Sequence, residues 1–223
     1  MSATGRSDVR HPDDFYATPA WCTESILDAL NLPAGTIVLD PSAGAGAILD
    51  VCDGHGFYSW GLELDVGRYH MLSGRHNAFH GDALDDTPWT IQARDQTLNR
   101  PRTVPFWCDH LDCIEHRELR AECMHNQTVV VMNPPFKLAM PFVQRACQEY
   151  SRVVALLRLN WLASLGRADW LREHTPAVYV LPRRPSFTGD GRADATDYAW
   201  MVWGFGPPTI NILNVHTVKG SSK

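Results

Sequence analysis

The stretch TIVLDPSAGAGAI, residues 36–48, decides the fold of this chain. Its first part is a short apolar run that ends in Asp40, and it predicts a buried strand. The loop that follows has almost no side chains, and apolar residues after it predict a helix that runs toward Gly54. Gly44 and Gly46 allow a tight turn and let a ligand approach the backbone closely. The free N–H groups of the helix would face the same space, which suits a carboxylate or a phosphate.

Strands and helices alternate on both sides of this loop. A helix over 17–32 precedes the first strand, with Thr18 as its expected N-cap and Pro19 in its first turn. Further helices are expected at 67–76 and 138–150, and further strands at 58–65, 129–132, 152–159, 177–181, 198–205 and 210–215. This alternation predicts an α/β fold, a mostly parallel twisted sheet with helices on both faces in a three-layer sandwich. In such folds the ligand lies beyond the carboxyl ends of the strands, where the strand order reverses.

The composition is that of a globular enzyme. The chain has 223 residues, of which 44% are hydrophobic and 20% are charged. We expect a polar arm at 1–13, a single domain at 14–216 with an irregular insertion at about 86–127, and a tail at 217–223. The first residues lack the apolar core of a signal peptide, and no apolar run reaches the roughly 18 residues of a membrane span, so we expect a soluble, cytoplasmic protein without a membrane partner. A net charge of −5 gives no global attraction to nucleic acid, which would need a local basic patch.

Three acidic residues follow three candidate strands in succession. Asp40 ends the first strand, Glu63 lies at the end of the second, and Asp82 follows a third candidate strand end. An acid after the second strand commonly receives ribose hydroxyls. A nucleoside ligand suits this set, whereas a triphosphate or a dinucleotide fits poorly because the P-loop Lys-Ser/Thr and the full G-x-G-x-x-G spacing are missing. Taken singly, a plain glycine-rich turn and solvated acids would explain these features about as well.

The strand at 129–132 stops at the sequence NPPF, residues 133–136. Proline cannot continue a sheet ladder, and Pro134 restricts the direction in which Asn133 projects. The side-chain oxygen of Asn133 and a peptide carbonyl of the corner offer two acceptors, which match the two hydrogens of one exocyclic amino group. Phe136 supplies a face on which a planar base can stack. An amino nitrogen whose two hydrogens are held by these acceptors becomes more pyramidal, so it can attack as a nucleophile before it loses a proton. The alternative is a cap that merely stops the strand.

The motifs DPSAGAG, GLELD, GDAL and NPPF, in this order, resemble the class I S-adenosylmethionine-dependent N6-adenine DNA methyltransferases of bacteria and their phages. FYATP, before the first strand, resembles the additional cofactor motif of these enzymes. LLRLNWLAS and RPSFTGDGRADATDYAWMVW resemble the region after the catalytic strand in small phage-type members. The similarity covers roughly residues 14–205. It implies a Rossmann-like class I methyltransferase fold and transfer of a methyl group from S-adenosylmethionine to the N6 amino group of adenine in DNA.

The resemblance also implies roles for individual residues. The cofactor site would consist of Tyr16, Thr18, Pro19, Asp40, Pro41, Ser42, Gly44, Gly46, Glu63 and Asp82. Within this site Asp40 and the two glycines would hold the methionine end, Glu63 the ribose hydroxyls and Asp82 the adenine amino group. The catalytic corner would grip an adenine flipped out of the DNA, and it would consist of Asn133, Pro134, Pro135 and Phe136.

Two departures from the family pattern concern the cofactor pocket and target recognition. Ser42 stands where many relatives carry an aromatic residue, which would loosen one wall of the cofactor pocket. No segment is long enough for a conventional target-recognition domain, so recognition would rest on the insertion or on the loop at 183–197. Arg183, Arg184 and Arg192 in that loop are candidate phosphate contacts, with a solvated basic turn as the alternative.

The insertion carries six soft metal ligands, which are Cys108, His110, Cys113, His116, Cys123 and His125. Four of them could build a tetrahedral zinc site that fixes the segment. Their spacing matches no standard C-x2-C pair, and part of the segment also fits an exposed helix. We therefore expect reduced cysteines without a metal, with structural zinc as the alternative that metal analysis would test.

Two further functions stay open on the sequence alone. The same chemistry could act on RNA adenine or on a protein glutamine, because related Asn-Pro-Pro-aromatic corners reach both. A catalytically silent DNA-binding subunit could keep the fold without the activity. The presence of Asp40, Glu63, Asp82 and Asn133 together favours an active enzyme. The sequence leaves the oligomeric state open.

Overall fold

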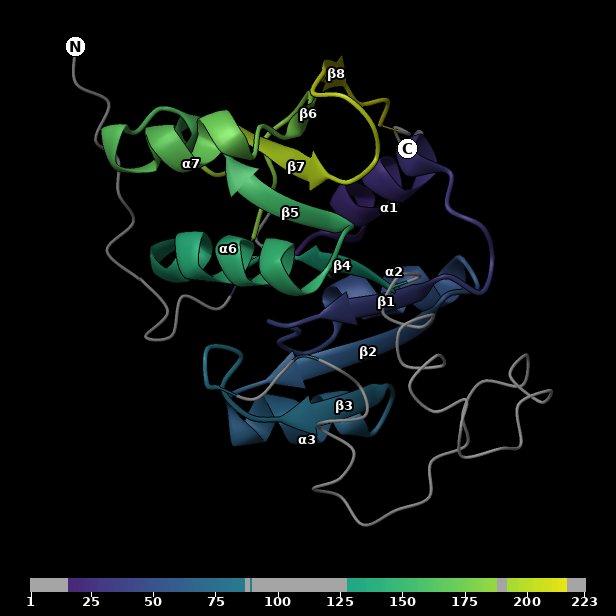
Figure 1. Cartoon of the computed structure of the whole chain (residues 1–223). Helices are drawn as coiled ribbons and strands as arrows, with labels where there is room; N and C mark the ends of the chain where they lie inside the picture. Colours follow the sequence, from purple (N-terminus) through teal and green to yellow (C-terminus); the bar gives the residue numbers. More distant parts are fainter. Residues whose placement is uncertain (1–15, 87–88, 90–127, 188–191, 216–223) are drawn as a thin grey trace, which may run out of the picture.

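The structure, a computed structural model of the chain, describes residues 16–86, 89, 128–187 and 192–215. Among these residues eight strands form one sheet in the order β3-β2-β1-β4-β5-β7-β6-β8 (Figure 1). All neighbouring pairs are parallel except those of β7, which is antiparallel to β5 and β6. The prediction of a mostly parallel sheet is confirmed. The strands are β1 (Ile37–Asp40), β2 (Tyr58–Glu63), β3 (Asn77–His80), β4 (Thr128–Met132), β5 (Val153–Arg158), β6 (Ala177–Val180), β7 (Tyr198–Trp203) and β8 (Ile210–Ile212).

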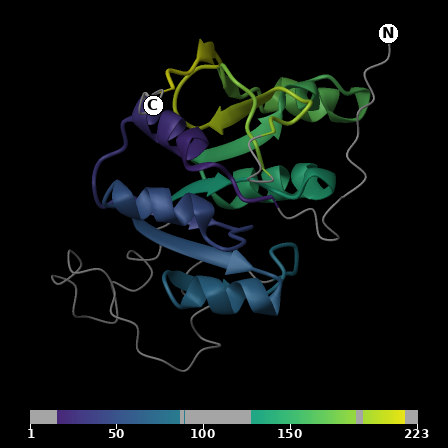
Figure 2. The same ribbon diagram turned by 180° about the vertical axis from the view of Figure 1, so that it is seen from behind.

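Helices cover both faces of this sheet, as the sequence predicts. The α-helices are α1 (Ala20–Leu30), α2 (Ala47–Gly54), α3 (Val66–Ser73), α6 (Ala139–Glu149) and α7 (Ala168–Glu173). The short 3-10 helices are η3 (Phe136–Leu138), η4 (Leu159–Leu162) and η5 (Leu165–Arg167). Helices α6 and α7 lie on one face, while α1, α2 and α3 lie on the other, which Figure 2 shows from behind. No helix in these described ranges has both the length and the apolar character that a membrane crossing requires.

The side chains of β1 alternate between the two faces and divide the core in two. Ile37 and Leu39 pack in one hydrophobic cluster with Phe142 of α6. Val38, between them, packs in the opposite cluster with Ile26 of α1. Successive residues of a strand point to opposite faces, so a strand buried on both sides has to be apolar throughout. The uninterrupted apolar run before Asp40 therefore follows from the central position of β1 in the sheet.

The strand order reverses between β1 and β4. The chain leaves β1 for β2 and β3 on one side and returns to β4 on the other, so that Leu39 pairs with Trp60 and with Val130. In open parallel sheets the crevice at such a reversal is the usual ligand site. Asp40 ends β1, and Asn133 directly follows β4, so both residues lie at this crevice.

The prediction that Thr18 caps α1 is wrong. The helix begins at Ala20, and its N-cap is Pro19, whose side chain makes no capping hydrogen bond. Thr18 is buried, and its hydroxyl oxygen accepts a hydrogen bond from Asn133 Nδ2 at 3.0 Å instead. The side chain is therefore bonded to the corner after β4, although its position before a helix is typical of a cap.

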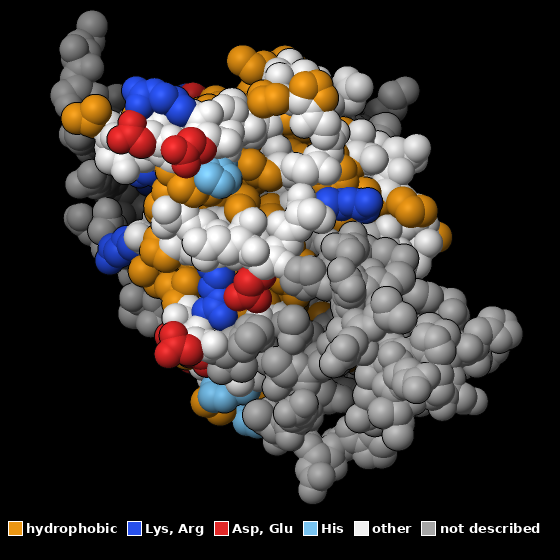
Figure 3. All heavy atoms as spheres, viewed as in Figure 1, with side chains coloured by type: hydrophobic (Ala, Val, Ile, Leu, Met, Phe, Trp, Pro, Cys, Tyr) orange, Lys and Arg blue, Asp and Glu red, His pale blue; other side chains and the backbone are white. Residues whose placement is uncertain are grey.

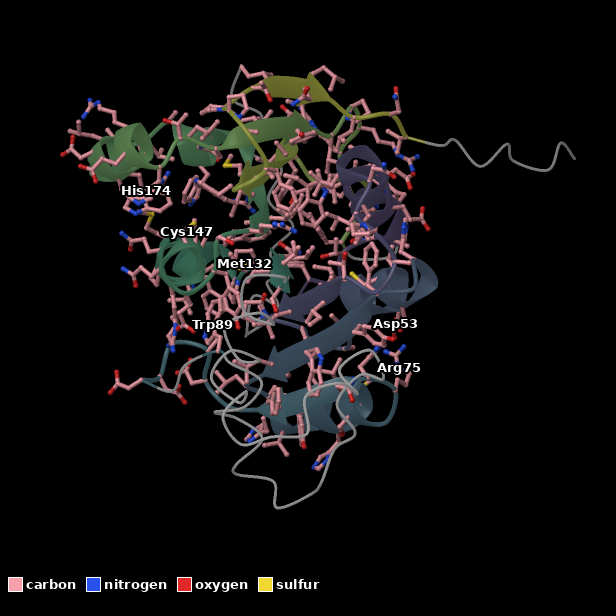
Figure 4. The ribbon with its side chains drawn as sticks, turned by 45° about the vertical axis from the view of Figure 1, so that its right-hand side comes forward. Asp53, Arg75, Trp89, Met132, Cys147 and His174 are labelled. Carbon is pink, nitrogen blue, oxygen red and sulfur yellow. The ribbon has the colours of Figure 1, made fainter. Side chains whose placement is uncertain are left out.

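Trp89 lies within the predicted insertion, yet it is a core residue with 1% of its surface exposed. Its indole N–H donates to the Ala83 carbonyl at 2.7 Å, and its backbone N–H donates to Glu149 Oε2 at 2.6 Å. The Tyr150 hydroxyl donates to the Trp89 carbonyl at 2.7 Å, and Figure 4 shows Trp89 below α6. These bonds hold the chain after β3 against α6. Residues 87–88 and 90–127 of the insertion are outside the described residues.

Candidate active site

A cavity of about 730 Å³ opens at the carboxyl ends of β1, β2 and β4. This volume is in the range of pockets that hold a cofactor-sized ligand. The glycine loop after β1 and the corner after β4 share this one cavity. Pro19, Gly46, Pro134 and Phe136 are not among its lining residues. The residues of the predicted site that line it are Tyr16, Thr18, Asp40, Pro41, Ser42, Gly44, Glu63, Asp82, Asn133 and Pro135.

Ser42 connects the glycine loop to the corner after β4. Asp40 Oδ1 accepts the backbone N–H of Ser42 at 2.9 Å and lies 3.2 Å from Ser42 Oγ. Ser42 Oγ also lies 3.3 Å from the backbone carbonyl oxygen of Asn133. A hydroxyl has one hydrogen, so Ser42 donates to one of these oxygens at a time. Ser42 thus lies between the two halves of the site, which are the glycine loop after β1 and the corner after β4.

Asp40 is an unusually weak acid in this structure. Burial raises the pKa of Asp40 from 3.8 to about 7, because a buried carboxylate loses its hydration. Hydrogen bonds from Ser42 work in the opposite direction, and the negative charge of Glu63 raises the pKa further. The carboxyl is therefore close to half ionised at neutral pH. A cation placed in the cavity would favour its ionised form.

Glu63 is buried and already accepts hydrogen bonds from the protein. Its Oε2 accepts the backbone N–H of Gly44 at 2.8 Å. Its Oε1 accepts the backbone N–H of Asp65 at 2.8 Å and Nε of Arg68 at 3.0 Å. Each carboxylate oxygen has two acceptor positions, so these bonds fix the carboxylate without using all of its capacity. The end of β2 and the glycine loop are joined through this side chain.

The glycines of the loop have backbone conformations that favour glycine. Gly44 has φ +56° and Gly46 has φ +93°, both in the left-handed region. A Cβ at Gly46 would lie 2.9 Å from Leu72 Cδ1 and 2.9 Å from His76 Cδ2. Gly46 is also the N-cap of α2, so the close approach of α3 and the start of α2 both depend on it.

The contact of α2 with the chain after α3 is held by charged groups. The His76 ring nitrogens lie 2.9 Å from Asp50 Oδ1 and 3.0 Å from Asp53 Oδ2. Arg75 Nη1 donates to Asp50 at 2.6 Å, and Arg75 Nη2 donates to the carbonyl of Ala45 within the loop. Asp53 and Arg75 lie close together in Figure 4. The glycine loop is thus supported from outside the cavity.

Asp82 lies two residues beyond β3 and is exposed at the cavity. Its Oδ1 accepts the backbone N–H of Leu84 at 2.8 Å, which fixes the turn. The acids at positions 40, 63 and 82 therefore face one space, as expected from three parallel strands that end at the same edge of the sheet.

The amide of Asn133 has a defined orientation. Its Nδ2 donates to Thr18 Oγ1 at 3.0 Å and to the Tyr16 carbonyl oxygen at 3.3 Å. Because a carbonyl oxygen only accepts, the nitrogen of the amide must face Tyr16. Asn133 Oδ1 is buried and has no hydrogen-bond partner among the described residues. Such an acceptor costs free energy until a donor reaches it.

Phe136 lies in a cluster of aromatic rings beside the cavity. The ring of Tyr16 is stacked on it, with centroids 5.5 Å apart and an interplanar angle of 27°. Phe187 and Tyr198 contact it at centroid distances of 6.4 Å and 6.0 Å and at steeper angles. Cζ of Arg158 lies 4.3 Å from the centroid of the Phe136 ring. The aromatic residue of the corner is therefore held from several sides.

Sequence reasoning missed Arg158 and Arg68. Arg158 is half-buried at the end of β5, and its Nε donates to the Tyr198 hydroxyl at 3.1 Å, which in turn donates to Asp194 Oδ2 at 2.8 Å. The sequence does hold a signal for Arg158. This residue is a charged residue at the end of an apolar run, and that run forms the strand beside β4. Arg68 reaches Glu63 from the first turn of α3, and no sequence pattern announces that contact.

The three predicted phosphate contacts lie outside the cavity lining. Arg183 Cζ lies 4.2 Å from the centroid of the Trp21 ring, and Arg184 pairs with Asp197 at 2.7 Å. Arg192 is exposed. On the face shown in Figure 3, Lys and Arg side chains are scattered, some of them beside Asp and Glu, and form no continuous basic surface over the described residues.

The Cys and His residues at 108–125, for which we expect no metal and name structural zinc as the alternative, lie outside the described residues. Within the described ranges, no group of three or more His, Cys, Asp or Glu side chains could hold a metal ion. Cys22 and Cys52 are free and buried, and burial raises the pKa of both thiols far above the usual value. Burial also raises the pKa of Cys147, to about 12. These thiols are protonated and unreactive at neutral pH.

The strand order, the helices on both faces of the sheet and the cavity at the strand-order reversal are those of a Rossmann-like class I methyltransferase fold. Solved structures of methyltransferases share it. A putative RNA methyltransferase from Pyrococcus horikoshii superposes with a TM-score of 0.59 at 15% identity over 88% of this chain and 89% of that one. A modification subunit of a putative type I restriction enzyme from Vibrio vulnificus YJ016 superposes with a TM-score of 0.54 at 14% identity over 94% of this chain and 49% of that one.

A third solved structure is the type I restriction-modification system methyltransferase subunit from Streptococcus thermophilus. It superposes with a TM-score of 0.53 at 14% identity, over 84% of this chain and 44% of that one. The chain therefore spans about half the length of these two restriction-modification subunits. No family model and no curated protein matches the sequence. At these identities the likeness is one of fold.

Proposed function

We propose that the protein transfers a methyl group from S-adenosylmethionine to the N6 amino group of adenine in DNA. The observation that carries this proposal is Asn133 Oδ1, a buried acceptor that has no hydrogen-bond partner in the described part of the chain, on a residue that lines the same cavity as the glycine loop. A donor N–H at this oxygen would remove the cost of leaving it unsatisfied. An exocyclic amino group is such a donor, and a methyl donor in the same cavity would lie next to it.

The residues at the strand ends suit S-adenosylmethionine. Asp40 would accept from the ammonium of its methionine part, and Glu63 would use the one acceptor position left on Oε2 for a ribose hydroxyl. Asp82, exposed at the cavity, would accept from the adenine amino group. Bound S-adenosylmethionine supplies a methyl group on a positively charged sulfur. The cavity of about 730 Å³ is large enough for a ligand of this size.

The corner after β4 would hold the acceptor nitrogen. Asn133 Oδ1 would accept one N–H of the adenine amino group, and a peptide carbonyl of the corner would accept the other. The lone pair of the nitrogen would then project out of the plane of the base and toward the cavity. The nitrogen would gain the methyl group as the methyl–sulfur bond breaks and S-adenosylhomocysteine leaves with the electron pair of that bond. It would afterwards lose a proton to water, so no strong general base is needed. The main contribution of the protein is orientation.

Three arginines are proposed to contact the DNA backbone. Arg183, Arg184 and Arg192 lie on or near the loop before β7, and Arg184 would exchange Asp197 for a phosphate. Each phosphate contact makes binding weaker at high salt, because the release of counterions from the DNA is less favourable when the surrounding salt is more concentrated. DNA as the acceptor is also supported by the restriction-modification subunits among the structural neighbours, whose fold this chain shares.

RNA adenine is the second candidate acceptor. It is favoured by the structural likeness to a putative RNA methyltransferase. The superposition with this chain covers 89% of the length of that protein. Single-stranded bases need no extrusion from a duplex, whereas flipping a paired base costs a few kcal/mol. DNA, RNA and a glutamine-containing peptide offered side by side distinguish the acceptors.

The test is a methyl-transfer assay with labelled S-adenosylmethionine and unmethylated DNA, followed by digestion to nucleosides. We expect label in N6-methyldeoxyadenosine with the wild type and a loss of at least 100-fold with Asn133→Ala, because the substitution removes a preorganised acceptor. Asn211→Ala is the matched control, because this asparagine lies on β8 and bonds only Thr209 through its side chain. No labelled adenine with the wild type, or equal labelling by Asn133→Ala, would contradict the proposal. Absence of S-adenosylmethionine binding in calorimetry would instead support a silent subunit.

A further inference from the structure

Tyr16 links the two halves of the candidate active site. Its backbone carbonyl accepts a hydrogen bond from Asn133 Nδ2 at 3.3 Å, and the residue also lines the cavity. Its ring points to the aromatic cluster, where it stacks on Phe136 and meets Phe187 edge-on at a centroid distance of 6.0 Å and an angle of 62°. The sequence resemblance assigns Tyr16 to the cofactor, but its ring contacts belong to the acceptor side.

The stack of Tyr16 on Phe136 has the geometry expected of a bound base. Among the rings that contact Phe136, Tyr16 is the one close to parallel, at 27°, whereas Phe187 and Tyr198 are inclined at 72° and 44°. Arg158 approaches the Phe136 ring as well, with Cζ at 4.3 Å from the centroid. The Tyr16 ring therefore occupies one of the places on Phe136 where a planar base would stack.

The main chain of Tyr16 is held by a hydrogen bond, whereas its side chain makes ring contacts and no hydrogen bond with the described residues. Asn133 bonds both the Tyr16 carbonyl and the Thr18 hydroxyl, so the segment cannot leave without breaking the bonds that orient the Asn133 amide. No hydrogen bond from the Tyr16 hydroxyl joins it to another described residue. Rotation about χ1 moves the ring between staggered positions without moving the backbone. The ring can therefore vacate the stacking place while Asn133 stays oriented.

We infer that Tyr16 is a specificity-determining residue for the acceptor, whose ring occupies the stacking place of the base on Phe136 until a base displaces it. This inference rests on the proposed function. It adds that the Tyr16 ring competes with the base for the stacking place on Phe136. An acceptor must replace the Tyr16–Phe136 stack with one of its own. A purine can do so because its ring system stacks on aromatic side chains, whereas the side chain of a glutamine has no ring to offer.

The experiment compares Tyr16→Ala with Tyr16→Phe. The probe is single-stranded oligo(dA), in which every base is an adenine, bound in the presence of S-adenosylhomocysteine and followed by fluorescence anisotropy. Removal of the competing ring should tighten binding by Tyr16→Ala about 2- to 10-fold, the range expected for one aromatic pair. Tyr16→Phe keeps the ring and should bind within about twofold of the wild type. Tyr58→Ala, an exposed tyrosine at the other end of β2, is the control and should bind as the wild type does.

The tightening must also depend on Phe136. In a Phe136→Ala background, Tyr16→Ala should no longer tighten binding, because the stack for which the two rings compete is gone. The KM for oligo(dA) should fall in Tyr16→Ala by the same factor as the Kd, which a merely destabilising substitution would not produce. Unchanged or weaker binding by Tyr16→Ala, or equal tightening without Phe136, overturns the inference. If the wild type methylates no adenine in any nucleic acid, the proposed function itself fails, and the two failures are thereby distinguished.

Discussion

At the scale of single residues, Asp40 is the group whose ionisation the cofactor would change most. Burial raises the pKa of Asp40 to about 7, so the carboxyl is mostly protonated below that pH in the free protein. A bound ammonium favours the carboxylate, and binding then has to release the proton. We therefore predict that affinity for S-adenosylmethionine rises as the pH increases through about 7, by up to about tenfold per unit below it.

This pH dependence is measured by calorimetry between about pH 5.5 and 7, where the α-amino group of the ligand, with an ordinary pKa of about 7.7–8.0, stays mostly protonated. Asp40→Asn should bind more weakly, and its affinity should not vary in this way. A wild-type affinity that is flat over this range would show that Asp40 does not face the ammonium.

Thr18 is predicted to act through Asn133. Its hydroxyl oxygen accepts from Asn133 Nδ2, and Thr18→Val removes this acceptor with little change in shape. One hydrogen bond contributes about 1 kcal/mol, so we expect kcat to fall about fivefold. Thr18→Ser keeps the oxygen and should retain most of the activity. Equal rates for the two variants in the methyl-transfer assay would remove Thr18 from the account.

At the scale of elements, the strand–loop–helix unit formed by β1 and α2 depends on Gly46. Gly46→Ala would introduce a Cβ at φ +93°, 2.9 Å from side chains of Leu72 and His76. We expect a loss of about 1–3 kcal/mol in the free energy of unfolding. The matched control is Gly54→Ala at the other end of α2, where an added Cβ meets nothing within 4 Å.

Urea denaturation of both glycine variants provides the measurement. Gly54→Ala should have the stability of the wild type or slightly more, since alanine is the better helix former. If Gly46→Ala is as stable as Gly54→Ala, the close contact between the loop and the chain after α3 is not tight in solution.

The elements that the sequence predicts well are those built from local patterns. Residues 36–54 contain the strand, the small-residue loop and the helix in one uninterrupted stretch, and the observed bounds of β1 and α2 follow this prediction closely. The antiparallel direction of β7 was not predicted, because no helix pattern between 181 and 197 fixes the direction of the next strand. Helix α7, with six residues, is too short to show a periodic pattern.

At the scale of the whole molecule, contacts distant in sequence decide the site. The sequence places an acid or an asparagine at each relevant strand end, and parallel strands bring those ends together. The contacts of Asn133 with Tyr16 and of Phe136 with Arg158 join separate segments, and nothing local to either segment announces them. The roles of the residues at the cavity, the phosphate contacts and the metal-free state of the cysteines at 108–125 stay predictions.

We predict that a ligand bound in the cavity stabilises the folded protein against thermal unfolding. A ligand that binds only the folded state stabilises it by about 2.7 kcal/mol at 100 times its Kd. S-adenosylmethionine and S-adenosylhomocysteine should both raise the Tm of the wild type, while NAD, which the loop lacks the motif to hold, should leave it unchanged. Thermal denaturation with each ligand makes the comparison. A larger shift with NAD would contradict the assignment of the cavity.

The most direct test of the central claim is the modified-base content of DNA from cells that express the protein in a host without adenine methylation. Nucleosides from this DNA are separated and measured by mass spectrometry, for the wild type and for Asn133→Ala at matched protein levels. We expect N6-methyldeoxyadenosine in the DNA of cells with the wild type and none above background with Asn133→Ala. DNA without the modified base in wild-type cells, or the same amount with both proteins, would contradict it.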